Sequence, residues 1–376
     1  MTNCFIKTLT IICFFPVIIL SCKPGEDVLD ARPYTLMDTA SQVTASMTLE
    51  ELAAQTLIIS PSHDTKISWS LLEWLHNTPP GGVILLGGNI GKQTSELRAF
   101  LRTLGYHSRG TPLFIAIDHE GGTVNRLRHI APPLANASEL GRSSVADARQ
   151  QFSTAASFLS SLGINMNFAP IMEPLLPENQ EFLRYRAFHS DPDIVYEMGS
   201  TMISAMLEYG VLPVAKHFPG SGNGDPHYTL PLIQQPINSP MDKLVRAFTL
   251  GINNSTMPAL MAAHVSVPSL DRDYPASISQ AVLSGFLREQ SGYQGLIITD
   301  DIYMKGMTAN YPPEQTAVLA LKAGADMILA MGGGYRQIQQ AIVEAVNSGE
   351  LPRQTLQAAV QRIVEAKLAL IQPPIE

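Results

Sequence analysis

Residues 295–301 read Gly-Leu-Ile-Ile-Thr-Asp-Asp, a short apolar run that ends in two carboxylates. Such a run, rich in β-branched residues, is typical of a strand buried within a parallel sheet. Seven other runs of this kind occur along the chain, and segments with helical periodicity separate them. In chain order they are 57–60, 82–86, 113–118, 164–170, 212–218, 259–265 and 326–330. This alternation predicts repeated βα units around a parallel sheet.

The number of units favours a closed barrel over an open sheet, because an eighth strand can pair with the first. The expected helices between and after the strands include 146–162, 194–209, 277–290, 313–323, 336–348 and 352–370. No Pro- or Ser-rich linker and no repeat of fixed period divides this part of the chain. We therefore predict an α/β fold, a single (β/α)8 TIM-type barrel over residues 34–376.

Composition excludes several classes of protein. The chain has 376 residues, of which 45% are hydrophobic and 15% charged. An average soluble domain has about 25% charged residues, so neither a disordered chain nor a coiled coil fits. The formal net charge is −8 and no long basic run is present. Nucleic acid is therefore not an expected partner.

The first residues are typical of an export signal. The uncharged stretch from Thr8 to Ser21 is too short to span a bilayer comfortably, and it ends in Ile-Leu-Ser-Cys at Cys22. That ending resembles the lipobox of bacterial lipoproteins. We expect a signal peptide over 1–22, lipidation of Cys22, a tether over 23–33 and anchoring to a bacterial membrane. An uncleaved anchor or an ordinary signal stays an alternative.

The cysteines give one further constraint. Cys4, Cys13 and Cys22 are the three cysteines of the chain, and all lie in this first segment. We therefore expect no disulfide and no thiolate metal site in the barrel.

Polar side chains follow four of the apolar runs, at the end of the barrel where active sites lie. An unpaired charge in an apolar core would cost several kcal/mol, so one shared polar opening best accounts for all of them. They are Asp118 and Glu120 after the third run, Lys216 and His217 in the fifth, His264 in the sixth, and Asp300 and Asp301 in the seventh.

Three motifs in the sequence carry a resemblance to a known family. Lys-His-Phe-Pro-Gly at 216–220, Asp-Pro-His at 225–227 and Ile-Thr-Asp-Asp-Ile-Tyr-Met at 298–304 resemble glycoside hydrolase family 3. The similarity is to its single-barrel β-N-acetylglucosaminidases, and further landmarks run from about residue 47 to 330 in the family's order. The resemblance implies a retaining glycosidase that releases terminal β-linked N-acetylglucosamine from peptidoglycan-derived or related glycans, and the first residues predict that it is exported.

The resemblance also assigns catalytic roles. Asp300 matches the nucleophile that forms a covalent glycosyl-enzyme, with Asp301 capping or supporting it. An Asp-Asp pair after a strand is otherwise typical of a helix N-cap. His227 matches the acid/base, and Asp225, two residues earlier, is expected to orient its imidazole.

Five residues match positions that bind the sugar. Charged donors and carboxylates suit a polyhydroxylated ring, because each makes charge-assisted hydrogen bonds. A structural ion pair, such as one between Asp118 and Lys216, is the alternative for each of them. The five are Asp118, Arg126, Arg186, Lys216 and His217.

The loop that carries His227 departs from the family pattern. Ser221 stands where the family's glucosaminidases usually have histidine, and the loop is two residues shorter than theirs. Gly220, Gly222 and Gly224 predict that this short loop is mobile.

Other functions stay open at this point. A phosphorylase or a β-glucosidase of the same family, or a carbohydrate-binding lipoprotein without activity, would share these motifs. We expect no metal and no cofactor, because no His-Glu-x-x-His or Cys-x-x-Cys spacing is present and the glycine-rich stretches lack the spacing of a dinucleotide site.

Overall fold

The chain divides into two units, Met1–Thr35 and Leu36–Glu376. The computed structural model describes residues 36–62, 64–108 and 111–371, all in the second unit. The predicted signal peptide, Cys22 and the tether therefore lie outside the described residues.

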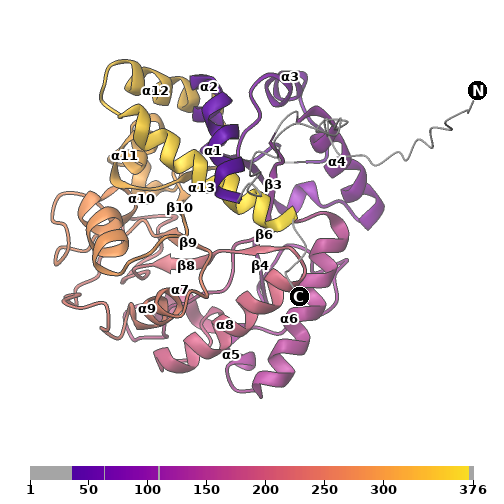
Figure 1. Cartoon of the computed structure of the whole chain (residues 1–376). Coiled ribbons are helices and arrows are strands. Elements are labelled where there is room, and N and C mark those ends of the chain that lie inside the picture. Colours follow the sequence, from indigo (N-terminus) through magenta and orange to yellow (C-terminus); the bar gives the residue numbers. More distant parts are fainter. Residues whose placement is uncertain (1–35, 63, 109–110, 372–376) are drawn as a thin grey trace, which may run out of the picture. The chain divides into compact units, whose positions relative to one another are not determined.

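The second unit is built around a ring of parallel strands (Figure 1). Along the sheet the order is β7-β6-β3-β2-β1-β11-β10-β9-β8. The strands are β1 (Leu57–Ile59), β2 (Gly82–Leu85), β3 (Phe114–Ile117), β6 (Met166–Asn167), β7 (Leu212–Pro213), β8 (Ala215–Phe218), β9 (Ala259–Ala262), β10 (Leu296–Asp301) and β11 (Met327–Ala330).

The ring closes because β7 and β8 are two parts of one predicted run, separated by Val214. β7 pairs with β6, whereas β8 pairs with β9. At the other junction β1 pairs with β11, in the register Leu57 with Ile328. Each of the eight predicted runs thus supplies one position in the ring, and the predicted (β/α)8 barrel is confirmed.

Alternation along the strands explains why both faces of the sheet are apolar. Ile58 and Ile84 pack with a cluster inside the barrel that also contains Phe114 and Ile298. The residues flanking Ile58 pack instead against the surrounding helices. Successive strand residues point to opposite faces, so a continuous apolar run supplies the barrel interior and the helical layer together.

The helices that follow the strands lie close to their predicted bounds. They include α6 (Val145–Leu162), α8 (Pro192–Glu208), α11 (Pro313–Ala323), α12 (Tyr335–Asn347) and α13 (Arg353–Ile371). Ser144 caps α6 by accepting a hydrogen bond from the Asp147 amide, and Gly163 ends it with φ of 87°. The predicted helix 277–290 instead splits into a 3-10 turn, η3 (Ala276–Ile278), and a π-helix, η4 (Ala281–Gln290).

Other elements were not predicted and fill the connections. They are α1 (Leu36–Ser46), α2 (Leu49–Gln55), α3 (Trp69–Asn77), η1 (Gly87–Asn89), α4 (Thr94–His107), the antiparallel pair β4 (His119–Gly121) and β5 (Val124–Asn125), α5 (Ala137–Leu140), α7 (Gln180–Leu183), η2 (Arg184–Arg186), α9 (Arg246–Asn253) and α10 (Lys305–Thr308). No helix in the described ranges is both long and apolar enough to cross a membrane.

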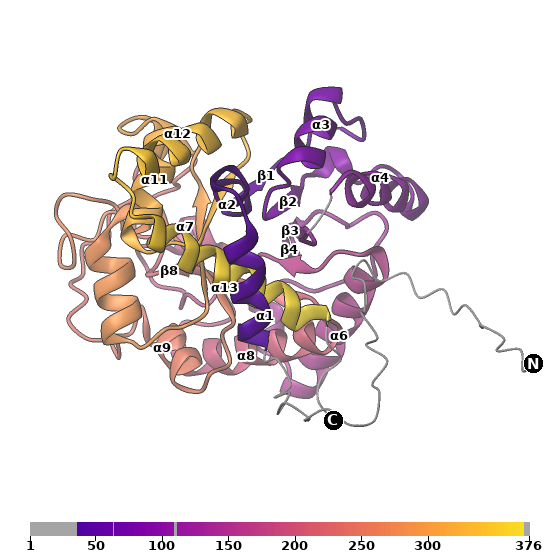
Figure 2. The same cartoon turned by 45° about the horizontal axis from the view of Figure 1, so that its top comes forward.

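Helix α13 closes the amino-terminal end of the barrel, alongside α1 (Figures 1 and 2). Ile363, with Ala366 and Leu370 beside it, packs onto the apolar cluster inside the ring. Lys367 is buried next to them, and its Nζ donates to Gln55 Oε1 at 2.8 Å and lies 5.3 Å from the centre of the Phe114 ring. Burial lowers the pKa of Lys367 to about 7.

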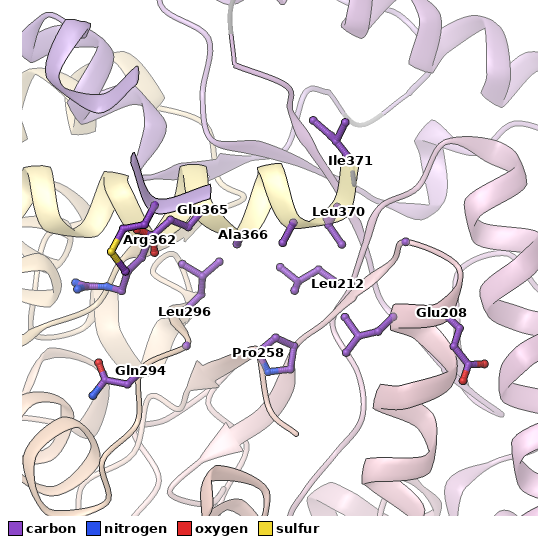
Figure 3. A pocket seen from close by; sticks show the side chains of 15 residues that line it. Glu208, Leu212, Pro258, Gln294, Leu296, Arg362, Glu365, Ala366, Leu370 and Ile371 are labelled. Atoms are coloured by element: carbon purple, nitrogen blue, oxygen red, sulfur yellow. The ribbon is translucent and has the colours of Figure 1, made fainter. Parts of the chain in front are cut away.

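A groove of about 790 Å³ lies at this same end (Figure 3). Its lining is largely aliphatic and includes Leu212, Pro258, Leu296 and Leu370. None of the predicted site residues lines it, so the chemistry is to be sought at the carboxyl ends of the strands.

Candidate active site

Strand β10 carries two adjacent buried carboxylates to the carboxyl end of the barrel. The Asp301 carboxylate accepts backbone hydrogen bonds from Met331 at 2.9 Å and Tyr303 at 3.3 Å. Asp301 thus holds β10 to the chain after β11 and caps the turn that follows. Asp300 accepts the Asp301 amide at 2.8 Å, and its charge interacts with His217, His264 and Lys216.

The two carboxylates differ in acidity. Burial raises the pKa of Asp300, but His217 and His264, the Asp301 amide and Lys216 outweigh that effect and hold it below its usual range. For Asp301 burial prevails and raises the pKa to about 6, although the Met331 and Tyr303 amides oppose it. Asp300 is therefore the carboxylate that is ionised at all ordinary pH values.

A buried cluster of opposite charges lies beside Asp300. Lys216 Nζ on β8 is 2.9 Å from Asp118 Oδ1 and 2.7 Å from Glu120 Oε1. Arg186 makes two 2.9 Å hydrogen bonds to the two oxygens of Glu120. Burial raises the pKa of Glu120, but Lys216 and Arg186 lower it to about 2. Arg126 lies at the exposed rim, with Nη2 3.6 Å from Asp118 Oδ2.

The sequence singled out four members of this cluster, and the structure brings all four together. The anticipated pair of Asp118 and Lys216 is present, as part of a network rather than alone. Glu120 was placed in the predicted polar opening but was given no role in binding or catalysis. It bridges Lys216 and Arg186, and without it Arg186 would lose its ion pair while Lys216 would keep only Asp118.

His217 is held by Glu173, which is fully buried. Its Nδ1 lies 2.7 Å from Glu173 Oε1. The same carboxylate accepts the Ser221 amide at 2.6 Å and the Ser221 hydroxyl at 2.8 Å. Ser221, which departs from the family pattern, therefore anchors the start of the loop that carries His227 to the carboxylate that also holds His217.

Sequence reasoning did not identify Glu173. It lies three residues beyond the fourth apolar run, so the rule that polar residues follow buried strands could have found it. Its partners could not be read from the sequence, because they come from a different βα unit.

The predicted acid/base pair is also brought together. His227 Nδ1 lies 2.7 Å from Asp225 Oδ1, and the same oxygen accepts the His227 amide at 2.9 Å. Because Nδ1 is bonded to Asp225 and the imidazole is half-exposed, Nε2 is the nitrogen that can contact a substrate. The charge of His227 lowers the pKa of Asp301, so this loop lies near the end of β10.

This geometry suits displacement at a sugar carbon. An ionised carboxylate, a proton donor and a set of charge-assisted hydrogen-bonding groups converge at one end of the barrel. In the described part of the chain, no cluster of three or more His, Cys, Asp or Glu side chains is arranged to hold a metal ion.

The chain is similar to curated proteins that are named as β-hexosaminidases. The chain is 34% identical over 257 residues to "Beta-hexosaminidase" of Hydrogenovibrio crunogenus, covering 66% of this chain and 71% of that protein. It is 28% identical over 378 residues to "Beta-hexosaminidase A" of Pseudoalteromonas piscicida, covering 89% of this chain. The chain spans 63% of the length of that second relative.

Two solved structures share the fold. A glycoside hydrolase family 3 β-N-acetylglucosaminidase from Paenibacillus sp. has a TM-score of 0.82 and 26% identity, covering 87% of this chain and 63% of that one. A β-N-acetylhexosaminidase from Beutenbergia cavernae has a TM-score of 0.78 and 25% identity, covering 86% of this chain and 99% of that one.

The family itself follows from a longer match. The glycosyl hydrolase family 3 N terminal domain matches residues 47–366, which span every strand of the barrel and every candidate site residue described above. The chain therefore belongs to glycosyl hydrolase family 3.

Proposed function

We propose that the protein is a retaining β-N-acetylglucosaminidase that releases terminal β-linked N-acetylglucosamine. The observation that carries the proposal is the convergence of the buried, ionised Asp300 with the Asp225–His227 pair at one end of the barrel. The relatives are named β-hexosaminidases, and the solved structures are named as a β-N-acetylglucosaminidase and a β-N-acetylhexosaminidase. These names support N-acetylglucosamine as the sugar that is released.

The proposed reaction has two steps. Asp300 attacks the anomeric carbon while protonated His227 donates a proton from Nε2 to the glycosidic oxygen, so the glycosidic bond breaks and the leaving group departs as an alcohol. Neutral His227 then takes a proton from water, and the resulting hydroxide attacks the anomeric carbon and frees Asp300. Asp225 accepts a hydrogen bond from His227 Nδ1, which orients the ring so that Nε2 can reach the glycosidic oxygen.

The charged cluster would bind the sugar in this reaction. Lys216, Arg186 and Arg126 supply donors, and Asp118 supplies an acceptor for ring hydroxyls and the N-acetyl group, with His217 completing the wall. Peptidoglycan-derived fragments are the proposed natural substrates. Export and a lipid anchor on Cys22 complete the proposal, on the evidence of the first residues of the sequence.

The test is hydrolysis of an aryl β-N-acetylglucosaminide beside the matching aryl β-glucoside, with and without phosphate. We expect free N-acetylglucosamine from the first substrate alone. Asp300→Asn should lower kcat on the order of a thousandfold or more, because the nucleophile is removed. The exposed Asp273→Asn is the matched control and should behave as wild type.

Three other outcomes would contradict the proposal. Sugar 1-phosphate formed with phosphate present would indicate a phosphorylase. Turnover of the glucoside would indicate a β-glucosidase. Sugar binding without turnover by the folded protein would indicate a carbohydrate-binding lipoprotein.

A further inference from the structure

We propose that Gly306 is a positioning residue that sets the height of the acid/base loop above the nucleophile strand. The inference rests on the proposed function, in which His227 protonates the leaving group. Gly306 is buried in the short helix α10, six residues after Asp300. It therefore links the two catalytic elements through the backbone.

The contact between Gly306 and the loop is direct. The Gly306 amide donates to the Pro226 carbonyl at 3.0 Å, and Pro226 directly precedes His227. A Cβ at position 306 would lie 2.7 Å from the Thr229 carbonyl oxygen and 3.0 Å from that of Pro226. Both obstacles are backbone atoms, so a side chain could be accommodated only if the loop moved.

The tip of the loop is a compact turn that moves as one piece. The Tyr228 and Thr229 amides both donate to the Asp225 carbonyl, at 3.0 and 3.1 Å. His227 is bonded to the Asp225 carboxylate through its amide and its ring. A displacement imposed at Pro226 and Thr229 is therefore passed to the imidazole with its hydrogen bonds intact.

The base of the loop is anchored independently of Gly306. Ser221 is bonded to Glu173, and the Asn223 amide donates to the Leu232 carbonyl at 3.2 Å. Leu232 also bridges to Ser266, beyond β9. Gly222 has φ of 66° and lies where a Cβ would meet the Leu232 carbonyl at 2.8 Å. This glycine permits close packing here, and the predicted mobility of the loop stays a prediction.

Substituting Gly306 should therefore lift the tip while leaving the base and the sugar-binding cluster in place. A misplacement of about 1 Å can cost on the order of a hundredfold in rate. The substitution should slow the step in which His227 transfers a proton to the leaving group. Aglycones that depart as stable anions need little protonation, so they should be nearly unaffected.

The experiment compares Gly306→Ala with Gly105→Ala in the full-length protein. Gly105 is exposed in α4 with no atom within 4 Å of an added Cβ, so it controls for the substitution itself. The measured quantity is kcat/KM on aryl β-N-acetylglucosaminides, from dinitrophenyl to phenyl leaving groups. We expect Gly306→Ala to lose roughly tenfold to a hundredfold on the phenyl substrate and little on the dinitrophenyl one.

A double-variant cycle sharpens the test. In a His227→Ala background, Gly306→Ala should cause no further loss, because the group it positions is gone. An equal loss on every substrate, or a loss that persists without His227, would show a general structural role and overturn the proposal. Wild-type behaviour of Gly306→Ala would overturn it as well.

A second measurement needs no folded variant. Hydrogen exchange of the wild-type Gly306 amide should be strongly slowed by its bond to Pro226, and rapid exchange would also overturn the inference. If the wild-type protein hydrolyses no substrate, the proposed function fails and the role of Gly306 fails with it. If the wild type is active and Gly306→Ala matches Gly105→Ala, the positioning role alone fails.

Discussion

Asp300 and Asp301 are neighbours in the chain, yet their carboxylates lie in opposite environments. Asp300 faces cations and histidines, whereas Asp301 faces two backbone amides and the charge of Asp300. Alternation along β10 produces this division, because successive side chains leave the strand on opposite sides. One strand end thus provides both a carboxyl group whose pKa lies below its usual range and a carboxyl group whose pKa is about 6.

Asp301→Asn should change how stability depends on pH. The folded pKa of Asp301, about 6, lies above its ordinary value of 3.8, so the folded state binds more protons between these values. This carboxyl therefore makes the protein less stable as pH rises from about 4 to about 6. Asparagine does not titrate and keeps an oxygen for the Met331 and Tyr303 amides.

The expected result is a variant more stable than wild type at pH 7, by on the order of 1 kcal/mol, with the difference disappearing towards pH 4. Urea unfolding at several pH values measures it, with exposed Asp273→Asn as the control. A difference that is the same at pH 4 and pH 7 would exclude titration of Asp301 as its cause.

At the scale of single residues, the sequence predicted the members of the site better than their partners. Asp300, Lys216 and Asp118 were found because charged groups follow buried strands. Glu173 was not, although it holds both His217 and Ser221. A hydrogen bond between residues of different βα units has no signature in the local spacing of the sequence. Such supporting residues can therefore be identified only once the fold is known.

Among the elements, α13 is unusual because the ammonium group of its Lys367 is buried at the base of the barrel. The folded pKa, about 7, lies below the ordinary 10.5, so the unfolded state binds more protons between these values. Stability linked to this group therefore rises as pH increases from about 7 to 10.5. Below pH 7 the full cost of burying the charge remains.

Lys367→Met should stabilise the protein by on the order of 1 kcal/mol at pH 6, less the hydrogen bond lost to Gln55. The gain should shrink as pH rises towards 10, where the wild-type amine is neutral. Thermal unfolding across this range is the measurement, and Lys322→Met, at an exposed pair with Glu350, is the control. A gain that does not change with pH would exclude relief of a buried charge.

At the scale of elements, apolar runs and helical periodicity predicted the bounds of the barrel strands and of most of the expected helices. The predicted 313–323 matches α11, and 146–162 begins one residue inside α6. The predicted segment 277–290 is helical, but its division into a 3-10 turn and a π-helix was not predicted, because so short a segment does not separate the period of an α-helix from the wider turn of a π-helix. The break between β7 and β8 at Val214 was not predicted, although Pro213, which has no backbone N–H to donate to a sheet, directly precedes it.

For the whole molecule, the count of βα units was enough to predict a closed barrel, because only closure removes both edges of such a sheet. The match to glycosyl hydrolase family 3 over 47–366 accords with one catalytic domain in this region. The placement of the protein in the cell rests on the first residues of the sequence and stays a prediction.

Cys22→Ser should release the protein from the membrane. The predicted lipid on Cys22 would supply the hydrophobic attachment, since burial of each methylene of an acyl chain contributes about 0.8 kcal/mol. Wild type should fractionate with membranes and carry the mass of the attached lipid, while the serine variant should lack that mass. Cys13→Ser is the control, and unchanged lipidation of the Cys22→Ser variant would contradict the predicted site.

The pairing of β1 with β11 has a consequence for the order of events during synthesis. Leu57 of β1 pairs with Ile328 of β11, so β1 cannot form this pairing until most of the chain has left the ribosome. At elongation rates of about 5–20 residues per second that delay is on the order of tens of seconds. The export proposed for this protein would have that interval to begin, because the native ring cannot close before it ends.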